Sequence, residues 1–288
     1  MRLFLKLIWL ALVAALMAGF AGALHPIGDS LSVFRPQVLV LLATASGLLW
    51  GLRMGVWAAL GAVFVLVAGL PLLVDPKQRP AGASVTLYQK NMLVSNPDLG
   101  PLEADIRAMA PDVLTLQEVS VKNRPILNAL SDLLPYQQFC HFGGVGEVAV
   151  ASRFPVVEPG ICAKGLAALH VDGPGGPMWL VSVHLRWPWP YQQAKDLAEI
   201  LPQIAALDGP VLIAGDFNMV RWSHALAEVR RAARVLAAGR ILGSFPQFAP
   251  LATLPIDQVM SPGGGQVEMR PLLGSDHYGL FATLRSAP

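Results

Sequence analysis

Three long apolar stretches near the N-terminus constrain this chain more than any other feature. Residues 7–24, 36–52 and 54–74 contain no charged side chain over 18, 17 and 21 positions. A helix that rises 1.5 Å per residue needs about 17–25 such residues to cross the hydrocarbon core of a bilayer. The sequence therefore predicts a transmembrane segment of residues 1–79, with about three helices near 3–24, 36–52 and 54–74.

The first apolar stretch is also compatible with a cleaved signal peptide. Arg2 and Lys6 form a basic start, and Ala21-Gly22-Ala23 has the small-residue pattern of a cleavage site. We favour a retained helix, but both alternatives place residue 80 outside the cytoplasm if the N-terminus starts inside. The Lys/Arg residues flanking the stretches divide three against three, so they do not decide the orientation. We expect the extracytoplasmic placement because a basic first helix usually dominates.

The remainder of the chain has the composition of a soluble domain. Over the full length, 54% of residues are hydrophobic and 14% are charged, against about 25% charged in typical soluble domains. This excludes intrinsic disorder, a collagen-like repeat and a small disulfide scaffold. Residues 80–288 carry 15 Lys/Arg and 17 Asp/Glu, a net charge of −2. A linker at 75–83, rich in Pro and Gly, is predicted to join the membrane segment to one soluble domain of residues 80–288.

The chain contains two cysteines, Cys140 and Cys162, both in the soluble part. The surrounding pattern places them on two strands that flank a strand at 147–153. In an oxidising compartment they would pair if their Cα atoms lie within about 7 Å. The alternative is two buried thiols, which we slightly favour, so the cysteines alone do not assign a compartment.

Short apolar runs and helical patterns alternate through the soluble part. The runs are rich in Val and Leu and are bounded by Gly, Pro or Asp, which is typical of buried strands. Strands are predicted at 84–92, 112–118, 147–152, 178–185, 211–216, 255–260 and 279–284, and helices at 99–109, 125–134, 192–206 and 223–238. This order indicates an α/β domain with a mixed sheet.

Polar side chains collect where the predicted strands stop. A rigid sheet can present such residues to a cleft, although any single Asp or Asn after a strand is more often a turn former or a helix cap. Six such positions offer oxygen or imidazole ligands and no cysteine, which suits Mg²⁺ or Mn²⁺ and does not match a zinc site. They are Asn91, Gln117-Glu118, His184, Asp216-Phe217-Asn218, Asp257 and Ser275-Asp276-His277. Motifs of the Walker, dinucleotide-binding and G-x-S-x-G types are absent from the sequence.

In order and spacing, these motifs resemble the endonuclease/exonuclease/phosphatase superfamily, which has a deoxyribonuclease-like fold. The resemblance covers about residues 84–286 and rests on L-Q-E at 116–118, S-R-F-P at 152–155, G-D-F-N at 215–218 and S-D-H at 275–277. It implies a four-layer α/β sandwich, with two mixed sheets flanked by helices and the site at one end. The N-terminal segment makes the chain similar to membrane-anchored, bacterial-type members.

The resemblance also implies a role for each motif residue. Metal binding is implied for Glu118, with Asn91 beside it and Asp276 completing the environment. The catalytic set implied is His184, Asp216, Asn218, Asp257 and His277. Asp216 would orient or deprotonate the attacking water, Asp257 would orient His277, and His277 would contact the phosphoryl group. Asn218 and His184 would bind the substrate phosphate, and Arg221 is a further candidate for substrate binding.

Two departures from the family pattern affect the substrate assignment. Gln258 follows Asp257 where members often have His, and the first strand ends in Lys90-Asn91-Met92 with only one amide. The densest basic group is Arg230, Arg231 and Arg234, for which a solvated helix face is the favoured interpretation. A loop with two Trp and one Tyr at 186–191 directly follows the strand that ends at His184, and packing on the domain edge is its favoured role.

Together these features predict a membrane-anchored, Mg²⁺- or Mn²⁺-dependent phosphoric ester hydrolase. The expected substrate is a lipid headgroup, a small phosphodiester or nucleic acid, and the expected location is an inner membrane with the catalytic domain on the extracytoplasmic side. The alternatives are a metal-dependent nuclease on DNA or RNA and a membrane-tethered binding module with little turnover. The near-neutral soluble domain favours the first interpretation over a nuclease, because nucleic-acid backbones require several Lys/Arg contacts. The sequence identifies no protein partner.

Overall fold

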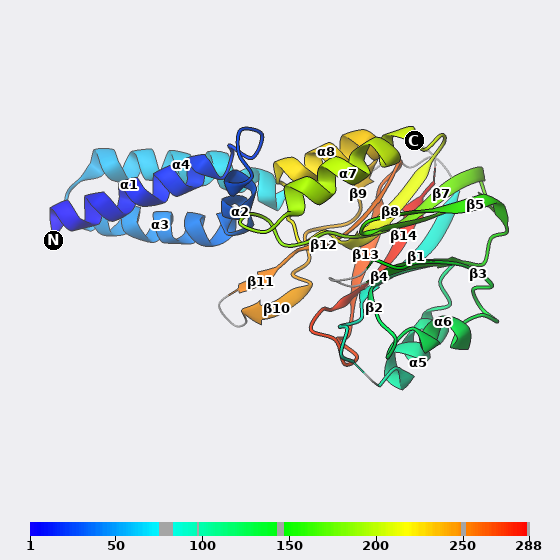
Figure 1. Ribbon diagram of the computed structural model, residues 1–288. Helices are drawn as coiled ribbons and strands as arrows, with labels where there is room; N and C mark the ends of the chain where they lie inside the picture. The colour runs from blue at the N-terminus through cyan, green and yellow to red at the C-terminus, as the bar shows by residue number, and fades with distance from the viewer. Residues whose placement is uncertain (75–82, 97, 143–146, 249–251, 287–288) are drawn as a thin grey trace.

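The computed structural model describes residues 1–74, 83–96, 98–142, 147–248 and 252–286. An N-terminal helix bundle projects from one side of an α/β domain (Figure 1). The predicted linker at 75–83 lies almost entirely outside the described residues. The bundle consists of α1 (Arg2–Ala18), α2 (Ile27–Val33), α3 (Arg35–Gly51) and α4 (Gly55–Leu73).

The bundle differs from the predicted three membrane spans. The first helix ends at Ala18 rather than near residue 24, because the chain turns at Gly19 and forms the short helix α2 before α3. By length and composition α4 can cross a membrane, whereas α2 and α3 would make a second span only as one helix, and they are bent by 68°. With 17 residues each, α1 and α3 are at the lower limit for a span. Three spans are therefore not confirmed.

The outer faces of these helices are apolar. Leu41, Trp50, Leu66 and Val67 are all more than half exposed. Inside the bundle, Trp9 and Leu42 are buried and the Trp9 indole donates a hydrogen bond to Ser46 Oγ. Contiguous exposed apolar surface of this kind is uncommon on soluble monomers and marks an interaction with lipid or protein.

Two six-stranded mixed sheets form the α/β domain. Sheet I has the strand order β13-β14-β1-β2-β4-β3, and sheet II has the order β5-β6-β7-β8-β12-β9. Sheet I contains β1 (Ser84–Asn91), β2 (Val113–Val119), β3 (Tyr136–Cys140), β4 (Glu147–Ser152), β13 (Gly265–Arg270) and β14 (Gly279–Arg285). Sheet II contains β5 (Val156–Ala163), β6 (Leu166–Gly173), β7 (Gly176–His184), β8 (Val211–Asp216), β9 (Leu236–Ala237) and β12 (Asp257–Ser261). A two-stranded sheet of β10 (Phe245–Phe248) and β11 (Ala252–Leu254) lies beside them.

Three apolar clusters show how the layers pack. One cluster fills the space between the two sheets, with Val85 and Leu280 from sheet I and Leu180 and Leu212 from sheet II. A second packs α7 (Gln193–Ala206) and α8 (His224–Ala233) on sheet II. A third packs α5 (Gly100–Met109) and α6 (Pro125–Ala129) on sheet I. The expected pair of mixed sheets flanked by helices is confirmed.

Two of the predicted helices end early. Helix α6 stops at Ala129 rather than at 134, and α8 stops at Ala233 rather than at 238. Arg234 adopts a left-handed conformation with φ of 58°, which terminates α8 and turns the chain into β9. The periodicity predicts that Arg230 and Arg234 share a helix face. Because α8 ends before Arg234, they do not.

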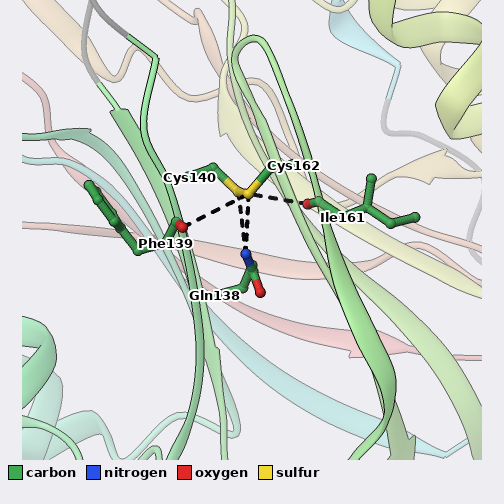
Figure 2. The surroundings of a disulfide bond; sticks show 5 residues. All are labelled: Gln138, Phe139, Cys140, Ile161 and Cys162. Atoms are coloured by element: carbon green, nitrogen blue, oxygen red, sulfur yellow. Dashed lines mark hydrogen bonds between the residues drawn. A yellow bond between two sulfur atoms is a disulfide. The ribbon is translucent and has the colours of Figure 1, made fainter.

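The two cysteines form a disulfide, which corrects the slight preference for free thiols. Cys140 ends β3 and Cys162 lies near the end of β5, with their Cα atoms 5.5 Å apart. Since β3 is an edge strand of sheet I and β5 an edge strand of sheet II, the disulfide links the two sheets (Figure 2). The sequence correctly indicates flanking strands but does not reveal that the second one belongs to the other sheet.

Candidate active site

The ends of five strands bring most of the predicted site residues together. The strands β1 and β2 run parallel, as do β7 and β8, so their carboxyl ends meet at one end of each sheet. His184 and Asp257 both lie opposite Asp216, from neighbouring strands of sheet II. Asn91 of sheet I reaches across to sheet II, because its Nδ2 donates to Asp216 Oδ2 at 3.0 Å. The candidate site therefore lies between the ends of the two sheets.

Glu118 reaches the site through a β-bulge. The register between β2 and β4 shifts between Gln117 and Val119, and Glu118 has a positive φ of 55°. This conformation is uncommon for a residue other than Gly or Asn, and it redirects the side chain. Glu118 Oε1 accepts a hydrogen bond from Asn91 Nδ2 at 3.1 Å, and Oε2 accepts one from the Val94 backbone amide at 2.8 Å. An observed strain of this kind points to a functional side chain.

Asp216 is surrounded by polar groups. Its Oδ2 lies 3.7 Å from Nε2 of His184 and 3.7 Å from Nε2 of His277. Its Oδ1 accepts the backbone amide of Asn218 at 2.8 Å. Burial raises the pKa of Asp216 to about 6, while the neighbouring His277 opposes that shift. Asp216 is therefore a buried carboxyl group whose Oδ2 faces two imidazole rings.

His277 forms a buried pair with Asp257. Its Nδ1 lies 2.8 Å from Asp257 Oδ2, and both side chains are almost fully buried. Burial alone would lower the pKa of His277, but Asp257 and Asp216 outweigh it and raise the pKa to about 10. The ring is therefore protonated at neutral pH, with its Nε2 directed toward Asp216. Asp257 Oδ1 also accepts a hydrogen bond from Gln89 Nε2 at 2.8 Å, and the Asp257 backbone amide donates to Ser244 Oγ at 3.2 Å.

Asn218 and Arg221 occupy different surroundings. Asn218 Nδ2 donates to the Leu185 carbonyl at 2.8 Å, which ties it to the loop after β7. Because an amide nitrogen has two protons, this bond still allows a contact with a phosphate oxygen. The Arg221 guanidinium donates to the Gly239 carbonyl at 2.8 Å and to the Ala238 and Arg240 carbonyls at 3.3 Å. Its predicted contact with substrate stays a prediction.

Sequence reasoning missed Lys90, which is fully buried beside the site. Its Nζ donates to the carbonyls of Pro271, Leu272 and His277 at 3.2, 2.7 and 2.5 Å. Burial lowers the pKa of Lys90 to about 8, partly offset by Asp257 and Asp276. The ammonium therefore uses its three donors to hold the segment that carries Asp276 and His277. The signal was a polar run, Gln89 to Asn91, at the end of an otherwise apolar strand.

A second missed group is a chain of buried amides and hydroxyls between the sheets. Gln89 Nε2 donates to Gln117 Oε1 at 2.8 Å as well as to Asp257, and Gln117 Nε2 donates to Ser182 Oγ at 2.9 Å. Ser182 in turn donates to the Leu116 carbonyl. These bonds connect β1 and β2 of sheet I with β7 and β12 of sheet II, and they fix the orientation of Asp257.

The donor set is suited to a hard divalent cation. Asp216, Asp257 and His277 offer ligand atoms that all lie within 4.8 Å of one another. This group differs from the predicted ligands Asn91, Glu118 and Asp276. Asp257 and His277 already bind each other, whereas Asp276 Oδ1 is a buried carboxylate oxygen with no hydrogen-bond partner among the residues that the structure describes. A buried oxygen without a donor, together with the carboxylates of Glu118 and Asp216 that Asn91 Nδ2 joins, fits the oxygen ligands that Mg²⁺ or Mn²⁺ prefers.

Two mixed sheets flanked by helices, with carboxylate, amide and histidine side chains gathered at one end, form an α/β sandwich. Residues 89–277 match the model of the endonuclease/exonuclease/phosphatase family, and the chain belongs to that family. No protein among those with curated descriptions matches the chain.

Solved structures of known proteins share the fold. TDP2 from D. rerio, complexed with a single-stranded DNA product, is 18% identical with a TM-score of 0.54, over 70% of this chain and 98% of that one. Sphingomyelinase C from Streptomyces griseocarneus is 18% identical with a TM-score of 0.52, over 70% and 100%. A beta toxin mutant from Staphylococcus aureus with bound magnesium ions is 17% identical with a TM-score of 0.53, over 70% and 100%.

Proposed function

We propose that this protein is a membrane-anchored, divalent-metal-dependent phosphoric ester hydrolase. Family membership and a fold shared with enzymes of phosphate esters support a hydrolase. The observation that carries the proposal is the position of Asp216 Oδ2, which lies between the Nε2 atoms of His184 and His277 and accepts from Asn91. A carboxylate held next to two imidazoles can take a proton from water while the rings contact a phosphoryl group.

Each side chain has a defined part in an in-line attack of water on phosphorus. Asp216 orients and deprotonates the water, and the protonated His277, held by Asp257, donates to a phosphoryl oxygen. His184 contacts the phosphate or the leaving group from the other side of Asp216. Asn218 donates to a phosphate oxygen. Glu118, Asn91 and Asp276 would hold Mg²⁺ or Mn²⁺, which supplies positive charge where negative charge collects during the reaction.

The helix bundle and the disulfide support the expected location. The exposed apolar faces of the bundle would be covered by lipid, and α4 is long enough to cross a bilayer. Disulfides persist in oxidising compartments and are rare in the cytosol of mesophiles. The Cys140–Cys162 bond therefore supports an extracytoplasmic catalytic domain. Alkaline phosphatase fused after residue 288 should then be active in a bacterial host.

A nuclease would use Arg221, Arg230, Arg231 and Arg234 to hold a nucleic-acid backbone, and the last three are poorly placed for this. Arg231 forms an ion pair with Glu228, and Arg234 lies at the C-cap of α8. Helix α8 begins at His224, soon after Asp216, and its ten residues extend about 15 Å from that point. Arg230, Arg231 and Arg234 thus lie at the helix end that is farther from the site. This arrangement favours small or membrane-borne phosphate esters over long nucleic acids.

The test is hydrolysis of bis-p-nitrophenyl phosphate by the full-length protein in detergent. Activity should require Mg²⁺ or Mn²⁺ and stop with EDTA. Glu118→Gln should lose about 10²–10³-fold in kcat/KM and recover partly with excess metal, whereas His277→Ala should lose a similar factor without recovery. Activity that persists in EDTA would contradict the metal dependence. Equal rescue of both variants by excess metal would contradict the assignment of metal binding to Glu118 and of phosphoryl contact to His277.

A further inference from the structure

Helix α2 is built into the catalytic domain. Asp29 of α2 is buried, and its two carboxylate oxygens accept the backbone amides of His224 at 2.7 Å and Ala225 at 3.0 Å. These amides belong to the first turn of α8, which contains no acidic residue of its own. A carboxylate at this position satisfies donors that the helix cannot satisfy itself and complements its dipole. The N-cap residue Ser223 accepts only the Leu226 amide, so Asp29 of the helix bundle satisfies two further amides in the first turn of a helix in the catalytic domain.

Close packing reinforces this joint between α2 and α8. The Trp222 indole donates to the Ser32 carbonyl at 2.8 Å, and Val33 belongs to the apolar cluster of sheet II, α7 and α8. A Cβ on Gly22 would overlap both the Asp29 carboxylate and the Cβ of His224. The joint thus combines hydrogen bonds, apolar burial and a position that accepts only glycine.

The joint also contacts the loop that leads to the site. Ser30 Oγ donates to the Trp189 carbonyl at 2.7 Å, and the His25 ring packs against the Trp189 ring at 6.2 Å between centroids. This loop follows His184 directly. From its Trp187 an aromatic path continues to Phe245 at 5.8 Å, and Phe245 lies 4.7 Å from the His277 ring. A continuous series of contacts therefore runs from α2 to His277.

The joint fixes the direction in which the site faces. The attachment through α2 holds the catalytic domain in one orientation relative to the helix bundle. The hairpin of β10 and β11, which carries Phe245 beside His277, projects from the same side of the domain as the helix bundle (Figure 1). With the bundle in a bilayer, this side of the domain faces the membrane surface.

We propose that the α2–α8 joint holds the active site over the bilayer and that the substrate is the phosphate ester of a lipid headgroup in the same membrane. This rests on the proposed hydrolase function. Asp29 is the principal positioning residue, and it acts through the orientation of the domain and the 186–191 loop. A fixed site meets lipids of its own membrane at a high effective concentration and has restricted access to other vesicles and to soluble polymers.

The experiment uses the full chain reconstituted with Mg²⁺ in vesicles of phosphatidylcholine, phosphatidylglycerol and sphingomyelin. Headgroup release is followed from the enzyme's own vesicles and from added enzyme-free vesicles, with bis-p-nitrophenyl phosphate and plasmid DNA as water-soluble substrates. Lipid in the enzyme's own vesicles should be cleaved at least about tenfold faster than lipid in added vesicles. Asp29→Ala should lower that rate at least about tenfold, because a misoriented site loses its alignment with the headgroup. Hydrolysis of bis-p-nitrophenyl phosphate should stay within about twofold of wild type.

Two further variants keep the test decisive. Ser30→Ala removes only the hydroxyl that donates to Trp189 and should lower lipid hydrolysis while the fold stays intact, so it decides the result if Asp29→Ala fails to fold. Asp132→Ala removes an exposed carboxylate that pairs with Arg107 of α5 and should change neither rate. Unchanged lipid hydrolysis in both Asp29→Ala and Ser30→Ala would overturn the proposal that the α2–α8 joint positions the active site. Faster cleavage of plasmid than of every lipid would overturn the substrate class and leave the hydrolase standing, and inactivity on all substrates would overturn both proposals.

Discussion

The helix bundle and the catalytic domain differ in which side chains they expose and which they bury. The bundle exposes Leu66 and Val67 and buries the indole–hydroxyl pair of Trp9 and Ser46 between its long helices, with buried charge in α2 and at the start of α3, at Asp29 and Arg35. The catalytic domain buries its apolar side chains in three clusters and also buries Lys90 and Asp257, each paired with hydrogen-bonding groups. Buried charge is costly without such partners. The difference indicates an apolar environment around the bundle and a preorganised polar interior in the domain, where the chemistry occurs.

The largest expected effect concerns buried charge in the domain. Lys90→Met leaves three carbonyls of residues 271, 272 and 277 without their donor, at about 1–3 kcal/mol for each unpaired group. We expect the free energy of unfolding to fall by about 3–5 kcal/mol and kcat to fall more than KM changes, because His277 loses its support. Denaturant unfolding and steady-state kinetics measure both. Lys122→Met, an exposed lysine, is the matched control and should be neutral.

The next effect concerns the bond between the two sheets. The Cys140→Ser/Cys162→Ser variant removes a crosslink between residues separated by 22 positions. Chain entropy predicts a loss of about 3.4 kcal/mol in the free energy of unfolding. The bundle should keep its association with vesicles, because neither cysteine contacts it. The same midpoint for the double variant and the wild type in denaturant, without reductant, would show that the sheets need no crosslink.

Exposure gives a direct test of the contrast between the two regions. Leu66→Lys places a charge on the outer face of α4 and should cost about 2.5–3.5 kcal/mol for insertion into a membrane. Val121→Lys makes the same kind of change at an exposed position of the catalytic domain and should have no effect. The measurement is the fraction of protein in the membrane after carbonate extraction. Equal behaviour of the two variants would show that the bundle is not surrounded by lipid.

The smallest effect depends on pH. The hydrogen bond from Arg270 holds the pKa of Asp105 below its usual value, and Tyr88 Oη adds a bond of 2.6 Å. A depressed carboxyl pKa stabilises the fold above the unfolded pKa of about 3.9, and this contribution disappears as the pH falls through the folded value. Asp105→Asn should therefore destabilise by about 2 kcal/mol at pH 7, with a difference that shrinks below about pH 4. Unfolding curves across pH check this, and Asp132→Asn, at an exposed ion pair, should change them less.

The sequence predicts much of the site because a polar residue that interrupts an apolar run can be recognised from its sequence neighbours alone. Glu118, His184 and Asp216 each end a buried strand, and the structure brings Asn91 from the other sheet to the same point. The contacts that hold the site are different. Lys90 binds carbonyls 181–187 positions away, and Gln89 binds Asp257 at a separation of 168. Such partners are set by tertiary structure, which local patterns do not contain.

The same reason explains what the sequence misses in the fold. Long apolar blocks indicate α3 and α4 almost to the residue, since their lengths are set by hydropathy alone. The seven residues of α2 carry no such pattern, and their role depends on α8. Cys140 and Cys162 lie on β3 and β5, which only β4 separates in the chain, yet β5 belongs to the second sheet. Strand order, and with it the disulfide, follows from how the sheets stack.

The Asp29 cap has a consequence for biosynthesis. The residues that it joins are 195 and 196 positions apart. At a synthesis rate of about 5–20 residues per second, His224 follows Asp29 out of the ribosome after roughly 10–40 s. During this interval the residues of α1 to α4, Asp29 among them, have been synthesised, whereas those of α8 have not. The α2 helix of the bundle then provides two hydrogen-bond acceptors for the first turn of α8, which is synthesised later.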